Sequence, residues 1–213
     1  MTISLVHPSR GRAVKARATA SKWISKMSDD NDVEYILSID HDDPQKGLYY
    51  QWFSIARISI AHNSNVVQAM NAGALLSIGQ IIVCISDDFE PPSHWDKLII
   101  DNYEWWKDIA IRVNDTITKE EDLILTLPIL SRSLYDKLGY IYHPGFTGMW
   151  ADNDLAEQCK AMGALINRFD LVFPHNHWVN GKAVKDATYN RHNTTESWNI
   201  GTKAIEQRRK QRI

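Results

Sequence analysis

The stretch Gln80-Ile81-Ile82-Val83-Cys84-Ile85-Ser86-Asp87-Asp88-Phe89-Glu90-Pro91-Pro92 carries the strongest indication of fold in this chain. Its apolar run, rich in Ile and Val, is typical of a central parallel strand that is covered on both faces. The run ends on Asp87 and Asp88, and open α/β sheets bind ligands at the carboxyl ends of such strands. Adjacent carboxylates repel each other unless a cation lies beside them, so the pair predicts a divalent metal with oxygen ligands. The alternative is an Asx-turn that closes the strand before Pro91.

A helix is expected directly before this strand. Asn65 offers an N-cap, apolar residues recur at helical spacing from Val66 to Leu75, and Gly79 supplies a stop. The stretch from Asn65 to Pro92 resembles the core of the family 2 glycosyltransferases of GT-A fold. In that family a helix with an Asn-x-Gly pattern precedes a strand that ends in a metal-binding motif of the Asp-x-Asp type.

The resemblance assigns roles to four residues of this region. Asn71 begins the Asn-x-Gly pattern and is expected in the nucleotide-sugar site. Asp88 matches the metal-binding carboxylate, and Asp87 matches the middle position of the motif. Ser86 occupies the first position, where the family has Asp, and with Asp87 it is expected to line the nucleotide-sugar site.

The N-terminal segment predicts an opening strand, Thr2 to His7, then the polar loop Pro8-Ser9-Arg10-Gly11-Arg12, then a helix. The helix is expected to bear the apolar residues Val14, Ala18, Trp23, Ile24 and Met27. The segment resembles the family's opening strand and Pro-Thr-x-x-Arg loop, which implies that Pro8, Ser9, Arg10 and Arg12 hold the nucleotide. A guanidinium pairs with phosphate oxygens as a fork, so Arg10 or Arg12 is the candidate for a diphosphate. The alternative is a solvated helix N-terminus with incidental arginines.

A second predicted strand, Val33 to Ile39, ends on Asp40-His41-Asp42-Asp43-Pro44. In the resembled family an acidic residue here contacts the base or ribose, which makes Asp40 the candidate. Asp42 and Asp43 are expected in a turn, because Asp-Pro favours turn initiation. Asp40 and Asp42 also have the spacing of a phosphatase of the haloacid-dehalogenase type. That alternative rests on three residues, and the glycosyltransferase pattern explains more of the chain.

The C-terminal half predicts an apolar strand from Leu123 to Leu127 and a short helix from Tyr135 to Leu138 that ends at Gly139.

Further along, Trp150-Ala151-Asp152-Asn153-Asp154-Leu155 resembles the acceptor-site motif Glu-Asp-x-Asp-Leu. Its second residue is the catalytic base in the family, which assigns that role to Asp152. Ala151 replaces the usual acidic residue, so Asp154 is expected to share the work. Both carboxylates also suit the N-terminus of a helix from Leu155 to Met162. Trp150, beside the base, is expected to contact the acceptor.

A further predicted strand, Arg168 to Phe173, leads into Pro174-His175-Asn176-His177-Trp178. Residues two apart on an extended segment share a face, so His175 and His177 are candidates for a metal held by Asp88. The resemblance implies one late His in the metal shell, and structural roles in a turn are the alternative. The segment Gly181 to Asp186, with Tyr189 and Arg191, is expected to form a mobile flap that closes over the diphosphate and excludes water.

Composition bounds these expectations. The 213 residues suit one domain with a sizeable core, and 24 Lys and Arg against 26 Asp and Glu give no general basis for nucleic-acid binding. No long apolar stretch or signal pattern is visible, so a soluble, cytoplasmic protein is expected. Cys84 and Cys159 are expected to be reduced and buried. The basic run Arg208 to Arg212 suits a solvated helix end or, alternatively, association with an anionic membrane surface.

The sequence therefore predicts a single GT-A-like α/β domain over residues 1–213, with a mixed, mostly parallel sheet between helices. Residues 1–92 form a Rossmann-like nucleotide-sugar half, residues 93–180 an acceptor half, and residues 181–213 a flap and tail. The resemblance implies a metal-dependent inverting transfer, with Mn²⁺ or Mg²⁺, from a nucleotide-diphosphate sugar to an acceptor hydroxyl of a saccharide or other molecule. A UDP-type donor is favoured. A catalytically inactive carbohydrate-binding domain is the alternative, because Ser86 and Ala151 replace acidic residues of the family's motifs.

Overall fold

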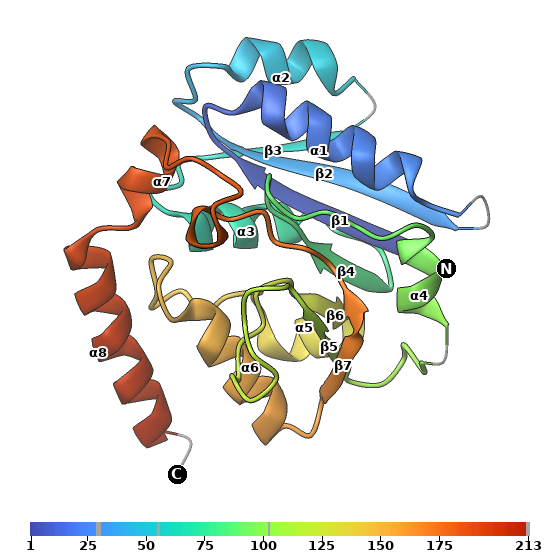
Figure 1. The fold of residues 1–213 in the computed structure, drawn as a ribbon, viewed down its shortest axis with the longest axis vertical. Coiled ribbons are helices and arrows are strands. Elements are labelled where there is room, and N and C mark those ends of the chain that lie inside the picture. Colours follow the sequence, from blue (N-terminus) through green and yellow to red (C-terminus); the bar gives the residue numbers. More distant parts are fainter. Residues whose placement is uncertain (29–30, 55, 102, 212–213) are drawn as a thin grey trace.

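The computed structural model describes residues 1–28, 31–54, 56–101 and 103–211, and its centre is a seven-stranded sheet (Figure 1). The strand order is β3-β2-β1-β4-β6-β5-β7. The strands are β1 (Thr2–Ser9), β2 (Asp32–Asp40), β3 (Arg57–Ala61), β4 (Ile81–Cys84), β5 (Ala110–Asn114), β6 (Ile129–Ser131) and β7 (Leu165–Val172).

The first four strands of the chain are parallel. β1 pairs with β2 and β4, and β2 pairs with β3. The short β6 runs antiparallel to both β4 and β5, while β5 and β7 are parallel. The prediction of a mixed, mostly parallel sheet in a single α/β domain is confirmed.

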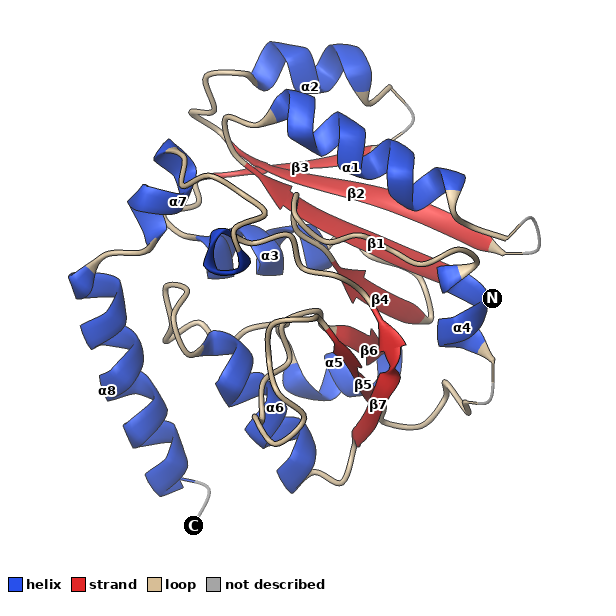
Figure 2. Ribbon diagram, in the orientation of Figure 1, coloured by secondary structure: helices blue, strands red, loops and turns tan. Residues whose placement is uncertain are grey.

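Helices cover both faces of the sheet (Figure 2). They are α1 (Ala13–Ser25), α2 (Lys46–Trp52), α3 (Val66–Ala74), α4 (Trp95–Ile100), α5 (Arg132–Leu138), α6 (Ala151–Ala161), the short 3₁₀ helix η1 (Trp178–Asn180), α7 (Ala187–His192) and α8 (Thr195–Gln211). Val83 of β4 packs in one core with Trp23 of α1 and Trp95 of α4, whereas its neighbour Ile82 packs in the other with Leu134 of α5. Successive strand residues face opposite sides, so the unbroken apolar run of β4 fills both cores.

Helix α1 forms where it was predicted but turns a different face to the sheet. Of the apolar residues that the predicted helix bears, Trp23 is buried, whereas Val14 and Ile24 are 68% and 48% exposed. The buried residues of the helix are Ala13, Ala16, Thr19 and Trp23. These residues lie three or four apart and form one stripe, and the small side chains of Ala13 and Ala16 let the helix approach the strands closely.

The prediction of a strand from Leu123 to Leu127 is wrong. This segment is irregular, and the strand of the region is β6, directly after Pro128. Its backbone groups find partners outside a ladder: Leu125 N donates to Asp152 O at 3.3 Å, and Arg112 Nε donates to the carbonyl of residue 124 at 3.1 Å. Leu125 and Leu127 are nevertheless buried. The apolar pattern correctly indicated that these side chains are buried, but an irregular segment can bury apolar side chains as well as a strand can.

Gly79 lies between α3 and β4, pressed against β1. A Cβ at this position would lie 2.7 Å from the backbone nitrogen of Ser4 and 2.8 Å from the carbonyl oxygen of Thr2, and backbone atoms cannot rotate away. We expect Gly79→Ala to lower the free energy of unfolding by about 1–3 kcal/mol, the usual range for overpacking. The control is Gly47→Ala in α2, where a Cβ meets nothing within 4 Å and Ala favours the helix. Denaturant unfolding compares the two variants, and equal stabilities would contradict the tight packing at Gly79.

Candidate functional site

Strands β1, β2 and β4 end at one edge of the sheet, because they are parallel neighbours. This is the point where the chain order reverses on either side of β1, the usual ligand position in open α/β sheets. The segment after β7 joins the same edge: Asn176 N donates to Asp88 O at 2.7 Å, and the ring of His175 stacks on Phe89 with centroids 4.3 Å apart. Residues from both halves of the chain thus meet here.

Asp88 faces His175 at this edge. His175 Nε2 lies 3.1 Å from Asp88 Oδ2, and the Ser86 hydroxyl donates to Asp88 Oδ1 at 2.5 Å. Burial by itself raises the pKa of Asp88, but the hydrogen bonds from His175 and Ser86 outweigh it and lower the pKa to about 2. Within the described part of the chain, no group of three or more His, Cys, Asp or Glu side chains is arranged to hold a metal. A carboxylate and an imidazole suit a divalent cation that takes its other ligands from phosphates.

His177 lies next to His175, with ring centroids 5.0 Å apart. Its Nδ1 accepts a hydrogen bond from Val179 N at 3.4 Å, at the start of η1. Burial, and then the neighbouring His175, lower the pKa of His177, which favours the neutral form. Of the two candidate histidines, the structure places His175 directly against Asp88, and ligation by His177 stays a prediction.

Asp87 points the other way, toward α1. Its side chain is only 4% exposed; Oδ1 lies 2.9 Å from His7 Nε2, and Oδ2 lies 3.4 Å from Arg12 Nη1. The other ring nitrogen of His7 is hydrogen-bonded to the hydroxyl of Tyr35. Asp87 therefore holds the guanidinium of Arg12 in place through its contact with Nη1. The sequence reasoning missed His7 and Tyr35, because a polar residue inside an apolar strand gives no sign of its partner.

Arg10 is occupied by the carboxylates that follow β2. Its Nη1 lies 2.7 Å from Asp40 Oδ2 and 2.5 Å from Asp42 Oδ1. The hydrogen bond from Arg10 lowers the pKa of Asp42 to about 2. Asp43 lies in a turn, as expected, where its Oδ1 accepts from Gln45 N at 2.7 Å. Asp40 and Asp42 share one guanidinium, which argues against the alternative of a phosphatase with a free Asp nucleophile.

Helix α6 begins at Ala151, earlier than the predicted start at Leu155. Its N-cap position is Trp150, with φ of 71°. Asp152 and Asp154 therefore lie in the first turn, as suits carboxylates at a helix N-terminus, but the alternative that they are the N-cap residues is wrong. Both carboxylates still face the positive end of the helix dipole.

Asp152 and Asp154 have different surroundings. Asp152 lines a cavity of about 310 Å³ together with Asp88 and His175, and burial raises the pKa of Asp152. Asp154 is 1% exposed and accepts a hydrogen bond from Arg208 Nε of α8 at 2.6 Å. The structure thus brings Asp152 to the proposed metal ligands, whereas Asp154 joins two helices and is not among the residues that line this cavity.

Trp150 and Asn71 also have packing partners. The ring of Trp150 lies against Trp198 of α8, with centroids 5.4 Å apart, and contributes to the core. Asn71 Nδ2 donates to Tyr142 O at 2.7 Å, and its Oδ1 accepts from the backbone nitrogens of Ile141 and Tyr142 at 3.0 Å. These contacts tie α3 to residues 141–142. We therefore leave both residues out of the ligand contacts proposed below.

The basic run near the C-terminal end belongs to α8, and Arg212 lies outside the described residues. Besides Arg208, which bonds Asp154, Arg209 Nη2 bonds Glu157 Oε1 of α6 at 2.5 Å. These charges are thus neutralised within the protein. Among the described residues, no helix is long and apolar enough to cross a membrane.

Three adjoining cavities share Arg12 and Tyr189 in their walls. The first, of about 220 Å³, lies at the ends of β1 and β2 and is lined by Pro8, Ser9, Arg10, Asp40, Ser86 and Asp87, among others. The second is the cavity of about 310 Å³ that holds Asp88 and Asp152. The third, of about 460 Å³, lies between α1 and residues 176–184 and is lined by the basic residues Lys15, Lys22 and Lys182 as well as Arg12.

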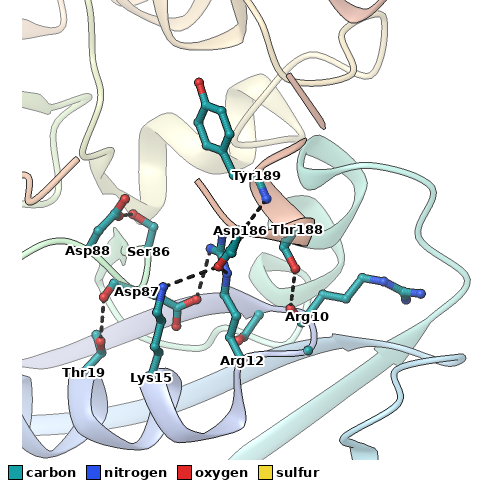
Figure 3. A network of polar contacts seen from close by, with 12 residues as sticks. Arg10, Arg12, Lys15, Thr19, Ser86, Asp87, Asp88, Asp186, Thr188 and Tyr189 are labelled. Carbon is teal, nitrogen blue, oxygen red and sulfur yellow. Dashed lines mark hydrogen bonds and ion pairs between the residues drawn. The ribbon is translucent and has the colours of Figure 1, made fainter. Parts of the chain in front are cut away.

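Residues 181–192, here called the closing segment, extend to the loop after β1 (Figure 3). Asp186 accepts hydrogen bonds from Arg12 Nε at 2.7 Å and Arg12 Nη2 at 2.5 Å. Lys15 Nζ lies 3.4 Å from the same carboxylate, and the Thr188 hydroxyl donates to Arg10 O at 2.9 Å. The segment expected as a flap is therefore attached to the predicted nucleotide loop; its mobility stays a prediction.

No protein-family model matches the sequence, and no curated protein matches it significantly. Solved structures do match. The mannosyltransferase PcManGT from Pyrobaculum calidifontis, in complex with GDP-Man and Mn²⁺, is 15% identical over 96% of this chain and 64% of its own, with a TM-score of 0.65. S. aureus TarS 1-349 in complex with UDP is 11% identical over 81% and 59%, with a TM-score of 0.62. Glucosyl-3-phosphoglycerate synthase from Mycobacterium tuberculosis, with Mn²⁺, UDP and phosphoglyceric acid, is 15% identical over 99% and 78%, with a TM-score of 0.60.

These likenesses show that the chain has the fold of the GT-A glycosyltransferases, as the resemblance implied. The chain spans 59% of the length of the TarS structure and 64% of that of PcManGT. At such low identity a shared fold does not carry an activity with it, so function has to be argued from the site.

The pairing of Asp88 predicts a specific acid response. Its folded-state pKa of about 2 is lower than the ordinary 3.8, so the ionised carboxylate stabilises the fold above the ordinary value and loses this effect as the pH falls toward 2. We expect Asp88→Asn to lower the free energy of unfolding near pH 6, by about 2 kcal/mol from this linkage alone, and to converge on the wild type near pH 2. Denaturant unfolding at several pH values measures this difference. A difference that does not change with pH would contradict the pairing.

Proposed function

We propose that this protein is a metal-dependent inverting glycosyltransferase, which moves a sugar from a nucleotide-diphosphate sugar to an acceptor hydroxyl. One observation carries the proposal: a single cavity is lined by Asp88 and His175, which suit a cation, and by Asp152, whose pKa is raised by burial. Displacement of a diphosphate by a hydroxyl needs positive charge at the leaving group and a base at the attacking group. The fold of GT-A glycosyltransferases supports this assignment.

The donor's nucleoside is assigned to the cavity of about 220 Å³, lined by Pro8, Ser9, Asp40 and Ser86. Asp40 would accept a hydrogen bond from the base or ribose. Arg12 is assigned to the diphosphate, because it lies in the walls of all three cavities, whereas Arg10 lines only the first of them. A UDP-type donor is the first to test and a GDP-type donor the second, since similar solved structures contain UDP or GDP-Man.

Asp88 and His175 would hold the Mn²⁺ or Mg²⁺, with His177 as a further candidate. When bound, such a cation acts as a Lewis acid that neutralises the charge developing on the departing diphosphate. The lowered pKa of Asp88 keeps this carboxylate ionised at physiological pH. Burial raises the pKa of Asp152, which suits this carboxylate to accepting a proton.

Asp152 is assigned as the base. As the acceptor oxygen bonds to the anomeric carbon, the bond from that carbon to the diphosphate breaks, and the hydroxyl proton passes to Asp152. A single displacement inverts the configuration at the anomeric carbon. A positioned base of this kind contributes about 10² to 10⁴ in rate. Asp154, bonded to Arg208, supports α6 in this scheme.

The acceptor is assigned as a saccharide or another hydroxyl-bearing molecule. The balanced charge of the chain gives no support for nucleic-acid binding, and the pairing of Arg208 and Arg209 with α6 disfavours an anionic membrane surface as partner. Cys84 and Cys159 are both buried thiols, which suits a reducing compartment, and we propose that the protein is cytoplasmic.

The metal assignment makes a prediction for Asp88→Asn. The wild type should gain thermal stability from UDP or GDP with Mn²⁺, because a ligand at about 100 times its Kd adds about 2.7 kcal/mol. The variant should lose the Mn²⁺-dependent part of this gain while it remains folded. A thermal-shift series with and without Mn²⁺ measures both effects. An unchanged metal response would remove Asp88 from the site.

The base assignment makes a prediction for Asp152→Asn, which keeps the size of the side chain but cannot accept the proton. We expect nucleotide binding close to that of the wild type and transfer reduced by about 10² or more. The control is Asp170→Asn, an exposed pair with Arg168 near the end of β7, which should transfer normally. NMR of the product gives its anomeric configuration. Normal transfer by Asp152→Asn would refute the assignment, and a wild type that binds saccharide without any nucleotide would favour the inactive carbohydrate-binding alternative.

A further inference from the structure

The closing segment places a carboxylate on the arginine that the proposed donor site offers to phosphate. Asp186 receives two hydrogen bonds from the guanidinium of Arg12, from Nε at 2.7 Å and from Nη2 at 2.5 Å, and Lys15 Nζ lies 3.4 Å away (Figure 3). A guanidinium holds two phosphate oxygens with the same fork. The carboxylate of Asp186 thus occupies the position beside Arg12 and Lys15 in which a phosphate group could bind.

Arg12 itself is fixed by the body of the protein. Its remaining terminal nitrogen, Nη1, lies 3.4 Å from Asp87 Oδ2, and the buried Asp87 is in turn held by His7. The backbone oxygen of Arg12 accepts from Ala16 N at 2.8 Å in the first turn of α1. The guanidinium of Arg12 therefore keeps its orientation whether Asp186 or another anion binds it. Asp186 is the partner that can be exchanged.

The closing segment makes two more contacts with residues of the proposed nucleoside site. Arg191 Nη1 lies 3.6 Å from Asp40 Oδ2, and the Thr188 hydroxyl donates to Arg10 O at 2.9 Å. The ring of Tyr189 also lies against the rings of His177 and Trp178, with centroids 5.7 Å apart in each case, whereas Val184 is 86% exposed. The described side chains of the segment belong to none of the three buried core clusters, and segments with few buried apolar contacts open at low free energy.

We propose that Arg12 and Lys15 form a phosphate-binding site that Asp186 occupies as an internal competitor, and that a diphosphate group displaces this carboxylate when it binds. The identity of the ligand as a nucleoside diphosphate rests on the proposed function. The exchange is ionic: Arg12 releases one carboxylate and takes phosphate oxygens, with no covalent step. Lys22 and Lys182, in the wall of the adjoining cavity of about 460 Å³, add positive charge for the larger anion. Asp186 therefore weakens binding of the very group that the site accepts.

The test is Asp186→Asn, which removes the charge and keeps the helix cap. Asp186 Oδ1 accepts from Tyr189 N at 2.8 Å as the N-cap of α7, and Asn caps about as well as Asp. We expect the Kd of inorganic pyrophosphate, and of UDP and GDP with Mn²⁺, to fall about tenfold by calorimetry, since charged hydrogen bonds are worth about that much. Asp186→Ser, another capping residue without charge, should behave alike. Lys15→Gln should raise the Kd.

The control is Asp170→Asn. Asp170 also forms a two-pronged pair, with Arg168 Nε at 2.8 Å and Nη2 at 2.7 Å, so the control makes the same change of charge outside the three cavities. Tighter binding by both Asp186 variants and not by the control supports the proposal. Equal or weaker binding, or equal tightening in the control, overturns it.

The probes separate this inference from the proposed function. Nucleotide binding that is equal in wild type and Asp186→Asn overturns the competitor and leaves the glycosyltransferase assignment intact. Tighter pyrophosphate binding in the Asp186 variants, with no nucleotide bound by any variant, supports the phosphate site and contradicts the assignment. Failure of every variant to bind pyrophosphate or nucleotide overturns both.

Discussion

Each carboxylate at the end of β4 lies beside a positively charged or imidazole partner of its own, and the arrangement of the site follows from this pairing. Asp87 and Asp88 are adjacent in the chain, and two unpaired carboxylates so close would each resist ionisation. They turn to opposite sides: Asp87 toward His7 and Arg12 on the α1 side, and Asp88 toward His175, which comes from the far half of the chain. Loss of a partner would leave a buried charge uncompensated, which is strongly destabilising. The end of β4 therefore fixes both the loop after β1 and the segment after β7.

Features that depend on local sequence were predictable. The apolar run of β4 and the presence of β1 and β2 follow from patterns within a few residues, although β1 continues to Ser9, beyond its predicted end at His7. Asn65 caps α3 as expected, accepting from Gln68 N at 3.0 Å. The parallel arrangement then gathers the residues at the strand ends, so Arg12, Asp40 and Asp88 could be assigned to one edge without any knowledge of packing. The same reasoning named His175 as a candidate, because it also follows a strand.

Features that depend on distant contacts were not predictable. The motif assigned the base to Asp152 and expected Asp154 to share its work, but side chains two residues apart on a helix point about 200° apart. In the structure Asp152 lines the cavity, Asp154 accepts a hydrogen bond from Arg208 of α8, and α8 lies close to the residues before α6: a Cβ on Gly201 would lie 2.4 Å from Met149 O. The partner that distinguishes the two carboxylates is thus 54 residues further along the chain, where no local pattern indicates it.

The pairing of each carboxylate with a positively charged or imidazole partner also limits how a diphosphate could bind at this site. Arg12 and Lys15 face Asp87 and Asp186, two positive charges against two negative ones. A diphosphate brings more negative charge than the one carboxylate it would replace, so its arrival leaves this cluster negative unless further cations join it. The adjoining cavity of about 460 Å³ supplies lysines, and a divalent cation at Asp88 would supply more. A cation at Asp88 and the basic cavity would thus both offset the charge of a diphosphate that lies beside the buried carboxylate of Asp87.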